Sequence, residues 1–336
     1  MKVGIIGAGF VGSTTAYTLA IKGLVRDIVL VDINTDKANA EAMDVIHAAA
    51  LNSDSNVYCG DYEDLDGAQI VIITVDSQKA LTDSRLDLLE SNTKIMREIV
   101  PKIIRNAPNC IILAATNPVD VITKVILDIS KFPSNRVIGS GTVLDTARFR
   151  AMLSDYFNVS PHSIHAYVMG EHGSSSLVSW STASIGGSSL DNYGTDTGRP
   201  LVNEAKAKMA QDVIDAGFKI YHGKRATYYG IASSLVKICE AIIKDEKRTL
   251  TVSSLHKNVE GFHDVCLSLP TIVSRRGAYG SVVPDLNDEE RKELRRSAEV
   301  MDKANREAEK ILRINCALHA IKPKKATDSK VHFWLT

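Results

Sequence analysis

The stretch MKVGIIGAGFVGSTTAYTLAIKGLVRDIVLVDI (1–33) decides the fold. Two runs of strand-forming residues, 3–6 and 28–31, flank a helical segment that opens on closely spaced glycines. A strand, a glycine turn, a helix and a second strand form the unit from which doubly wound parallel sheets are built. We therefore expect an α/β fold that begins with this unit.

The glycines have the spacing G-x-G-x-x-G. The first permits a tight turn, the second lets backbone N–H groups approach a pyrophosphate, and the third lets helix and strand pack closely. Asp32 closes the second strand, and an acid there can accept both ribose hydroxyls of NAD and would repel the 2′-phosphate of NADP. The sequence predicts NAD as cofactor, held by Asp32 and by the helix start at Gly7, Gly9, Phe10, Val11 and Gly12.

Further apolar runs without in/out alternation predict strands that are buried on both faces, at 69–74, 110–114 and 137–138. Helical segments are expected at 36–47 and 86–105, the second stopping where Pro108 follows. We assign 1–140 to a Rossmann domain with a doubly wound parallel sheet, ending at the glycines that follow the last strand.

The second half has a different pattern. Long helices are expected at 201–221 and 226–243, and Asn287 with Glu290 indicates the start of a last helix. Short β-like stretches at 249–253 and 265–269 accompany them, so 141–320 is expected to be a mixed α+β substrate domain. Residues 191–200 are expected to form a surface loop, and 321–336 a C-terminal tail.

Composition excludes several classes of protein. The chain has 336 residues, with 40 basic and 40 acidic side chains, so it lacks the bulk positive charge of a nucleic-acid binder or a polybasic membrane anchor. No apolar run reaches the length of about 20 residues that a membrane helix needs. The five cysteines are scattered and contain no C-x-x-C pair, which favours a cytoplasmic setting and disfavours a structural zinc or a disulfide framework; no metal is expected.

Three short segments carry candidate chemistry. TNPVD (116–120) comes directly after a buried strand, at the edge where α/β folds place their ligands. Asp145 and Arg148 are three residues apart and so share one helical face. GEHG (170–173) presents a histidine in a glycine-flanked turn.

With these segments the chain resembles the NAD-dependent L-lactate dehydrogenases of the lactate/malate dehydrogenase family. The resemblance covers about residues 1–315. Its motifs are GAGFVG (7–12), Asp32, SRLDLLESN (84–92), TNPVD (116–120), IGSGTVLDTARFR (138–150), GEHG (170–173) and ATYYGIA (226–232).

The resemblance implies a role for each matching residue. His172 corresponds to the general acid/base, Asp145 to the carboxylate that orients it, and Arg85 to the arginine of a mobile loop that polarises the carbonyl. The substrate-binding residues implied are Arg148, which would hold the substrate carboxylate bidentately, together with Asn117, Thr227 and Lys79. Asn117 would also lie beside the nicotinamide.

The departures from the family pattern concentrate around the substrate. Asp76 replaces a glycine close to the cofactor, Leu81-Thr82 replaces Pro-Gly in the loop hinge, and Ser174 replaces an aspartate beside the catalytic histidine. Lys79 falls on the position that selects the substrate side chain, glutamine in lactate and arginine in malate dehydrogenases. If the alignment of this loop with the family is shifted by one residue, Lys79 instead matches a lysine of the family pattern. Both alignments remain possible.

We therefore expect an NAD-dependent oxidoreductase that interconverts a small 2-oxo acid and its 2-hydroxy acid. The alternatives are a malate dehydrogenase-like enzyme, a reductase for a bulkier or specialised 2-oxo acid, and a non-catalytic NAD-binding protein. The resemblance also implies a homodimer or homotetramer. Arg150 and His165 match positions that bind fructose 1,6-bisphosphate in allosteric bacterial relatives, although ordinary interface side chains are the alternative.

Overall fold

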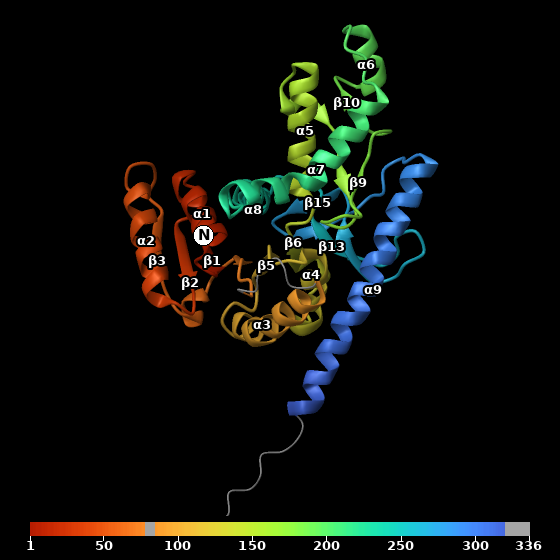
Figure 1. The fold of residues 1–336 in the computed structure, drawn as a ribbon. Coiled ribbons are helices and arrows are strands. Elements are labelled where there is room, and N and C mark those ends of the chain that lie inside the picture. Colours follow the sequence, from red (N-terminus) through yellow and green to blue (C-terminus); the bar gives the residue numbers. More distant parts are fainter. Residues whose placement is uncertain (78–84, 320–336) are drawn as a thin grey trace, which may run out of the picture.

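The computed structural model describes residues 1–77 and 85–319. A central sheet is covered by helices on both faces, and a second group of helices and short strands stands beyond one edge of it (Figure 1). The described residues of the first half form six strands, all parallel: β1 (Lys2–Ile6), β2 (Asp27–Val31), β3 (Asn56–Cys59), β4 (Ile70–Ile73), β5 (Ile111–Ala114) and β6 (Val137–Gly139).

The strand order across the sheet is β3-β2-β1-β4-β5-β6, which is that of a doubly wound nucleotide-binding domain. The expected parallel sheet is therefore confirmed, and only its short strand β3 was not anticipated. Two strands from the second half, β13 (Ser253–His256) and β14 (Val265–Ser268), continue the sheet antiparallel beyond β6. Within the described part of the chain the sheet thus has eight strands, and both halves contribute to it.

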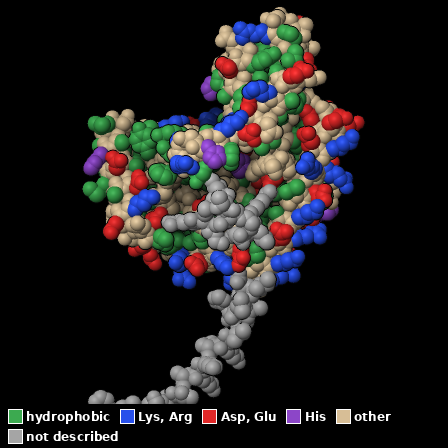
Figure 2. Space-filling model, viewed as in Figure 1, with side chains coloured by type: hydrophobic (Ala, Val, Ile, Leu, Met, Phe, Trp, Pro, Cys, Tyr) green, Lys and Arg blue, Asp and Glu red, His purple; other side chains and the backbone are tan. Residues whose placement is uncertain are grey.

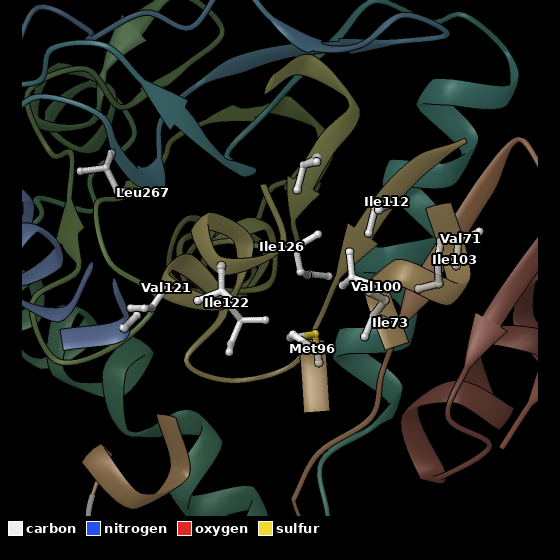
Figure 3. Packing of buried hydrophobic residues seen from close by; sticks show 14 of the residues in the cluster. Val71, Ile73, Met96, Val100, Ile103, Ile112, Val121, Ile122, Ile126 and Leu267 are labelled. Atoms are coloured by element: carbon white, nitrogen blue, oxygen red, sulfur yellow. The ribbon is translucent and has the colours of Figure 1, made fainter. Parts of the chain in front are cut away.

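Helices of the first half connect its strands: α1 (Phe10–Ile21), α2 (Thr35–Ala49), α3 (Arg85–Asn106) and α4 (Val119–Ser130). Alternate residues of each strand point into different cores. On β4, Val71 and Ile73 join the cluster with α3, α4 and the last helix, while Ile70 and Ile72 join the cluster with α1 and α2. Figure 3 shows the first of these clusters, in which Met96 and Val100 lie near Ile73 and Ile122 lies beside Val121. Burial on both faces accounts for the continuous apolar strand sequences.

The second half contains α5 (Val143–Phe157), α6 (Leu190–Asp196), α7 (Asn203–Lys224), α8 (Tyr229–Ile243) and α9 (Asp288–His319). Small antiparallel sheets lie among them: β7 (Ile164–His165) with β10 (Ser184–Ile185) and β11 (Ser188–Ser189), β8 (Val168–Met169) with β9 (Leu177–Val178), and β12 (Arg248–Leu250) with β15 (Thr271–Ser274) and β16 (Gly277–Tyr279). Short 3₁₀ helices cover Tyr62–Leu65, Ser134–Arg136 and Pro161–Ser163.

Helix ends show how well local signals work. At the start of α9, Glu290 N–H donates to Asn287 Oδ1, and Asn287 N–H donates to Glu290 Oε2, so the predicted cap is confirmed. The loop predicted at 191–200 is wrong in its first part, because α6 occupies Leu190–Asp196. Ser189 caps that helix by accepting from Asn192 N–H, and buried Leu190 anchors it despite the glycine and the aspartates.

The surface agrees with the balanced composition. Figure 2 shows acidic and basic side chains mixed over the visible face, where neither sign dominates. Within the described residues, no helix is both long and apolar enough to cross a membrane.

Packing around Ile72 leads to a prediction about the free energy of unfolding. Ile72 lies on a central strand and is fully buried at 0% exposure, so Ile72→Ala leaves a cavity that neighbouring strands cannot close. We expect a loss of about 2–5 kcal/mol in the free energy of unfolding, measured by urea denaturation. The control Ile33→Ala, at a side chain that is 101% exposed, should leave that free energy unchanged. Equal losses in the two variants would contradict this account of the core.

Candidate active site

The glycine loop between β1 and α1 has the geometry that its sequence predicts. Gly7 has φ +103°, a conformation that L side chains rarely adopt, and a Cβ on Gly12 would lie 1.9 Å from the Gly7 carbonyl oxygen. A Cβ on Gly9 would meet nothing within 4 Å. The first and third glycines are therefore needed by the fold, whereas the space at Gly9 is kept clear at the start of a helix, where an anion is favoured.

Asp32 joins the second strand to this loop. Its Oδ2 accepts from Ala8 N–H at 2.6 Å, and its Oδ1 accepts from Asn34 N–H at 2.9 Å. Each carboxylate oxygen can accept a further hydrogen bond, so the arrangement fits the ribose of a dinucleotide whose phosphates follow the glycine loop. Val11 lines the large cavity described next, and the exposed Phe10 ring stacks on Tyr228, with ring centroids 5.3 Å apart.

A cavity of about 770 Å³ lies between the two halves of the chain. The carboxyl ends of β4 and β5, helices α5 and α7 and the GEHG loop form its walls. Among the described residues, five of those predicted to be catalytic or substrate-binding line it together: Asn117, Asp145, Arg148, His172 and Thr227. Residues that are distant in sequence thus converge on one space beside the glycine loop.

Asp145 is the centre of the polar wall. Its Oδ2 lies 2.6 Å from His172 Nδ1, and its Oδ1 accepts from Arg148 Nη1 at 2.8 Å. Asp145 and Arg148 lie in the first turns of α5, so the helix presents both to the cavity, as the three-residue spacing predicts. One buried carboxylate therefore holds the imidazole on one side and the guanidinium on the other.

These contacts change the acidity of both partners. Burial by itself raises the pKa of Asp145, but the adjacent His172 and Arg148 outweigh it and hold that pKa below the usual 3.8. Burial by itself lowers the pKa of His172, yet Asp145 first and Asp120 second outweigh burial and Arg148 and raise it above 6.5. The geometry favours an imidazolium beside a carboxylate, which is a suitable proton donor near neutral pH.

Some predicted residues fall outside what the structure describes. Lys79 and Leu81-Thr82 lie outside the described residues, and Arg85 begins α3, although the description does not extend to its side chain. Asp76, on the cavity wall, is held by Asn92 Nδ2 at 2.7 Å, and burial raises its pKa. Ser174 is exposed and does not line the cavity, whereas Ser176 does.

The two proposed effector residues lie away from this cavity. Arg150 donates from Nε to the Ala166 carbonyl at 3.0 Å, and its guanidinium lies 5.4 Å from the centre of the Tyr167 ring. Burial lowers the pKa of Arg150. His165 is exposed at the end of β7. Nothing in this geometry tests a bisphosphate, and that site stays a prediction.

Sequence reasoning missed three contributors to the site. Asn92 is fully buried and donates both to Asp76 and, at 2.7 Å, to the Asn117 carbonyl, so it ties together the loops after β4 and β5. Asp120 accepts from the His172 backbone N–H. Helix α7 adds an apolar wall that includes Phe218. Asn92 and Asp120 lie within recognised motifs, but nothing in those motifs shows which atoms they contact.

Comparison with known proteins places these features in a family. Residues 1–139 match the lactate/malate dehydrogenase NAD binding domain, and residues 142–311 match the lactate/malate dehydrogenase alpha/beta C-terminal domain. The chain belongs to the lactate/malate dehydrogenase family. The predicted family, the Rossmann nucleotide-binding domain and NAD as its cofactor are therefore confirmed.

Individual relatives agree. The chain is 46% identical over 301 residues to an L-lactate dehydrogenase of Thermus aquaticus, covering 90% of this chain and 97% of that one. It is 44% identical over 300 residues to the L-lactate dehydrogenase of Acetivibrio thermocellus, covering 89% and 95%. A crystal structure of a lactate dehydrogenase enzyme from a Medee basin deep-sea metagenome library superposes with a TM-score of 0.87 at 36% identity, covering 92% and 98%.

The nucleotide site carries a prediction. Asp32→Ala removes the predicted acceptor for the ribose hydroxyls and the negative charge that is expected to repel a 2′-phosphate. We expect NADH to bind at least about tenfold more weakly, with a smaller loss or a gain for NADPH, as measured by fluorescence titration of the nucleotide. The matched control is Asp36→Ala, at an exposed acid in the first turn of α2. Unchanged affinities for both nucleotides in Asp32→Ala would remove Asp32 from the site.

Proposed function

We propose that this family member catalyses the reversible reduction of a small 2-oxo acid to an L-2-hydroxy acid, with pyruvate as the leading substrate. The observation that carries the proposal is the chain of contacts from His172 through Asp145 to Arg148 on one cavity wall, next to the glycine loop. The names of the relatives support pyruvate and lactate as the substrate pair.

The mechanism follows from these positions. The glycine loop and Asp32 would hold NADH, which would supply the hydride for the carbonyl carbon. His172, held at Nδ1 by Asp145, gives its Nε2 proton to the carbonyl oxygen, so that the C=O bond becomes C–H and O–H. Arg148 donates one hydrogen bond to Asp145. Its remaining N–H groups can hold the substrate carboxylate through two parallel hydrogen bonds. In the reverse direction the neutral imidazole accepts the hydroxyl proton.

Other residues orient the substrate. Asn117 and Thr227 line the cavity from the cofactor side and from the α7–α8 connection, where a substrate oxygen and the substrate side chain would lie. We assign Arg85 to carbonyl polarisation and Lys79 to the side-chain end on the family pattern alone. Asp145 holds His172 in orientation and balances the charge of its protonated form.

A bulkier 2-oxo acid is a second candidate, because one specific observation favours it. The α7 wall of the cavity is apolar, with Ile214, Phe218 and Tyr221 among its residues. Gly217 lies in the same wall, and a Cβ there would meet nothing within 4 Å. Space and apolar surface at one end of the cavity suit a branched or aromatic substrate side chain. The malate-like alternative depends on Lys79, which lies outside the described residues.

Three further predictions from the sequence remain proposals. We propose a homodimer or homotetramer, and the exposed apolar side chains Tyr17, Met43 and Tyr229 on α1, α2 and α8 are the surface that would support it. A cytoplasmic setting rests on the scattered cysteines. Fructose 1,6-bisphosphate, with Arg150 and His165, stays an effector prediction on the family pattern.

Substrate preference is tested by NADH consumption with pyruvate, oxaloacetate, 2-oxobutyrate, 2-oxoisocaproate and phenylpyruvate. We expect pyruvate to give the highest kcat/KM. If 2-oxoisocaproate or phenylpyruvate leads, the open α7 wall defines the substrate. If oxaloacetate leads, Lys79 faces the substrate and reads its second carboxylate. Turnover of none, with NADH still bound, would contradict the proposed reaction and favour a non-catalytic NAD-binding protein.

The proton donor is tested separately. His172→Ala removes the group that transfers the proton, and general acid/base catalysis typically contributes 10²–10⁴-fold. We expect kcat to fall by about that factor at neutral pH while the Kd for NADH, measured by fluorescence, stays within about twofold. The matched control His263→Ala alters an exposed histidine outside the cavity and should leave both constants unchanged. Near-normal turnover in His172→Ala would refute the assignment.

A further inference from the structure

Asp120 is a buried acid that the mechanism above does not use. It lies in the first turn of α4, directly after the segment that carries Asn117, and is 2% exposed. Its Oδ2 accepts from the His172 backbone N–H at 2.8 Å. A carboxylate in the first turn of a helix is stabilised by the helix dipole, so Asp120 suits a fixed negative charge.

This hydrogen bond crosses from one half of the chain to the other. Helix α4 belongs to the part that matches the NAD binding domain, whereas His172 belongs to the part that matches the C-terminal domain. The reaction needs a hydride donor held by the first part and a proton donor held by the second, both aimed at one carbonyl group. The bond from Asp120 joins the two parts at the residue that gives the proton.

The same acid contributes to the charge around the imidazole. The charged groups that act on His172 are Asp145 and Arg148 from α5 and Asp120 from α4. The Asp120 charge raises the pKa of His172, in the same direction as Asp145 and against Arg148. Asp120 also acts on Cys266 of β14, whose pKa is raised first by burial and then by this carboxylate. Asp76 is a further acid on the cavity wall.

We propose that Asp120 is the positioning residue that holds His172 across the boundary between the two domains and places a second negative charge beside its imidazole. The role in turnover rests on the proposed function, because it acts through His172. The charge favours the imidazolium, which is the form that donates a proton during reduction. Removing the charge therefore lowers the pKa of His172 and leaves less of the donor form at any pH above that pKa.

Asp120→Asn separates charge from geometry, since its amide oxygen can still accept from the His172 N–H. We expect the NMR titration of the His172 imidazole, assigned by the signal missing in His172→Gln, to shift down by about half a unit or more. The pH profile of kcat/KM for pyruvate reduction should shift equally, a loss of about threefold on its alkaline side. The matched control Asp128→Asn alters a partly exposed acid on the same helix, paired with Lys124, and should titrate as the wild type.

Asp120→Ala removes both charge and acceptor. We expect kcat to fall about tenfold or more at every pH, with the Kd for NADH unchanged, because His172 loses its anchor while the glycine loop is untouched. If Asp120→Asn does not fold, Asp120→Ser takes its place in this comparison, because serine is also neutral and its hydroxyl oxygen can accept a hydrogen bond. A wild-type titration in the folded neutral variant would overturn the electrostatic role, and a wild-type kcat in Asp120→Ala would overturn the anchoring role.

The imidazole titration needs neither substrate nor turnover. If the wild-type protein reduces none of the 2-oxo acids, the proposed function fails, but the titrations of the wild type and of Asp120→Asn still decide whether Asp120 acts on His172. If the wild type reduces pyruvate and the Asn variant titrates and turns over as the wild type does, the proposed function stands and the role of Asp120 fails.

Discussion

Asp145 carries a negative charge in a buried position, where it loses most of its solvation by water. The geometry of the rest of the site depends on which groups compensate this loss of solvation free energy. An isolated buried carboxylate would take up a proton instead. Here each of its two oxygens contacts a basic group. The imidazole Nδ1 of His172 lies 2.6 Å from one oxygen, and Arg148 Nη1 lies 2.8 Å from the other. Because both partners also line the cavity, the need to satisfy one buried acid holds the proposed proton donor and the proposed carboxylate-binding group in one geometry.

The sheet determines where this ion cluster lies. Parallel strands end at the same edge, so the loops after β1, β4 and β5 meet there and bring Gly7, Thr74 and Asn117 close together. Thr74 Oγ1 donates to the Gly7 carbonyl at 2.9 Å, and Thr116 Oγ1 donates to the Val75 carbonyl at 2.5 Å. Short side chains thus connect neighbouring loops to one another. This side of the cavity is therefore anchored to the ends of buried strands.

Sequence alone predicted those parts of the molecule that are determined by local or strictly periodic constraints. Gly7 signals a tight turn with positive φ, and Gly12 signals the close approach of the helix to that turn. The apolar run 70–73 signals a doubly buried strand, and Asn287 signals a cap through its own hydrogen bonds. Helix α6 was missed because its stability comes from Leu190 in a core that local composition does not reveal. Asn92 and Asp120 act through contacts between distant segments, which only the folded chain specifies.

The way in which β13 and β14 join the sheet affects whether the nucleotide-binding half of the chain can fold on its own. Ser253 pairs with Gly139, so the outer edge of β6 is covered by strands that are made more than a hundred residues later. A chain that ended near residue 140 would leave those N–H and C=O groups unpaired along an apolar strand, an edge that invites pairing with other chains. During synthesis the nucleotide-binding half therefore emerges with one unprotected side and depends on its own C-terminal continuation to close it.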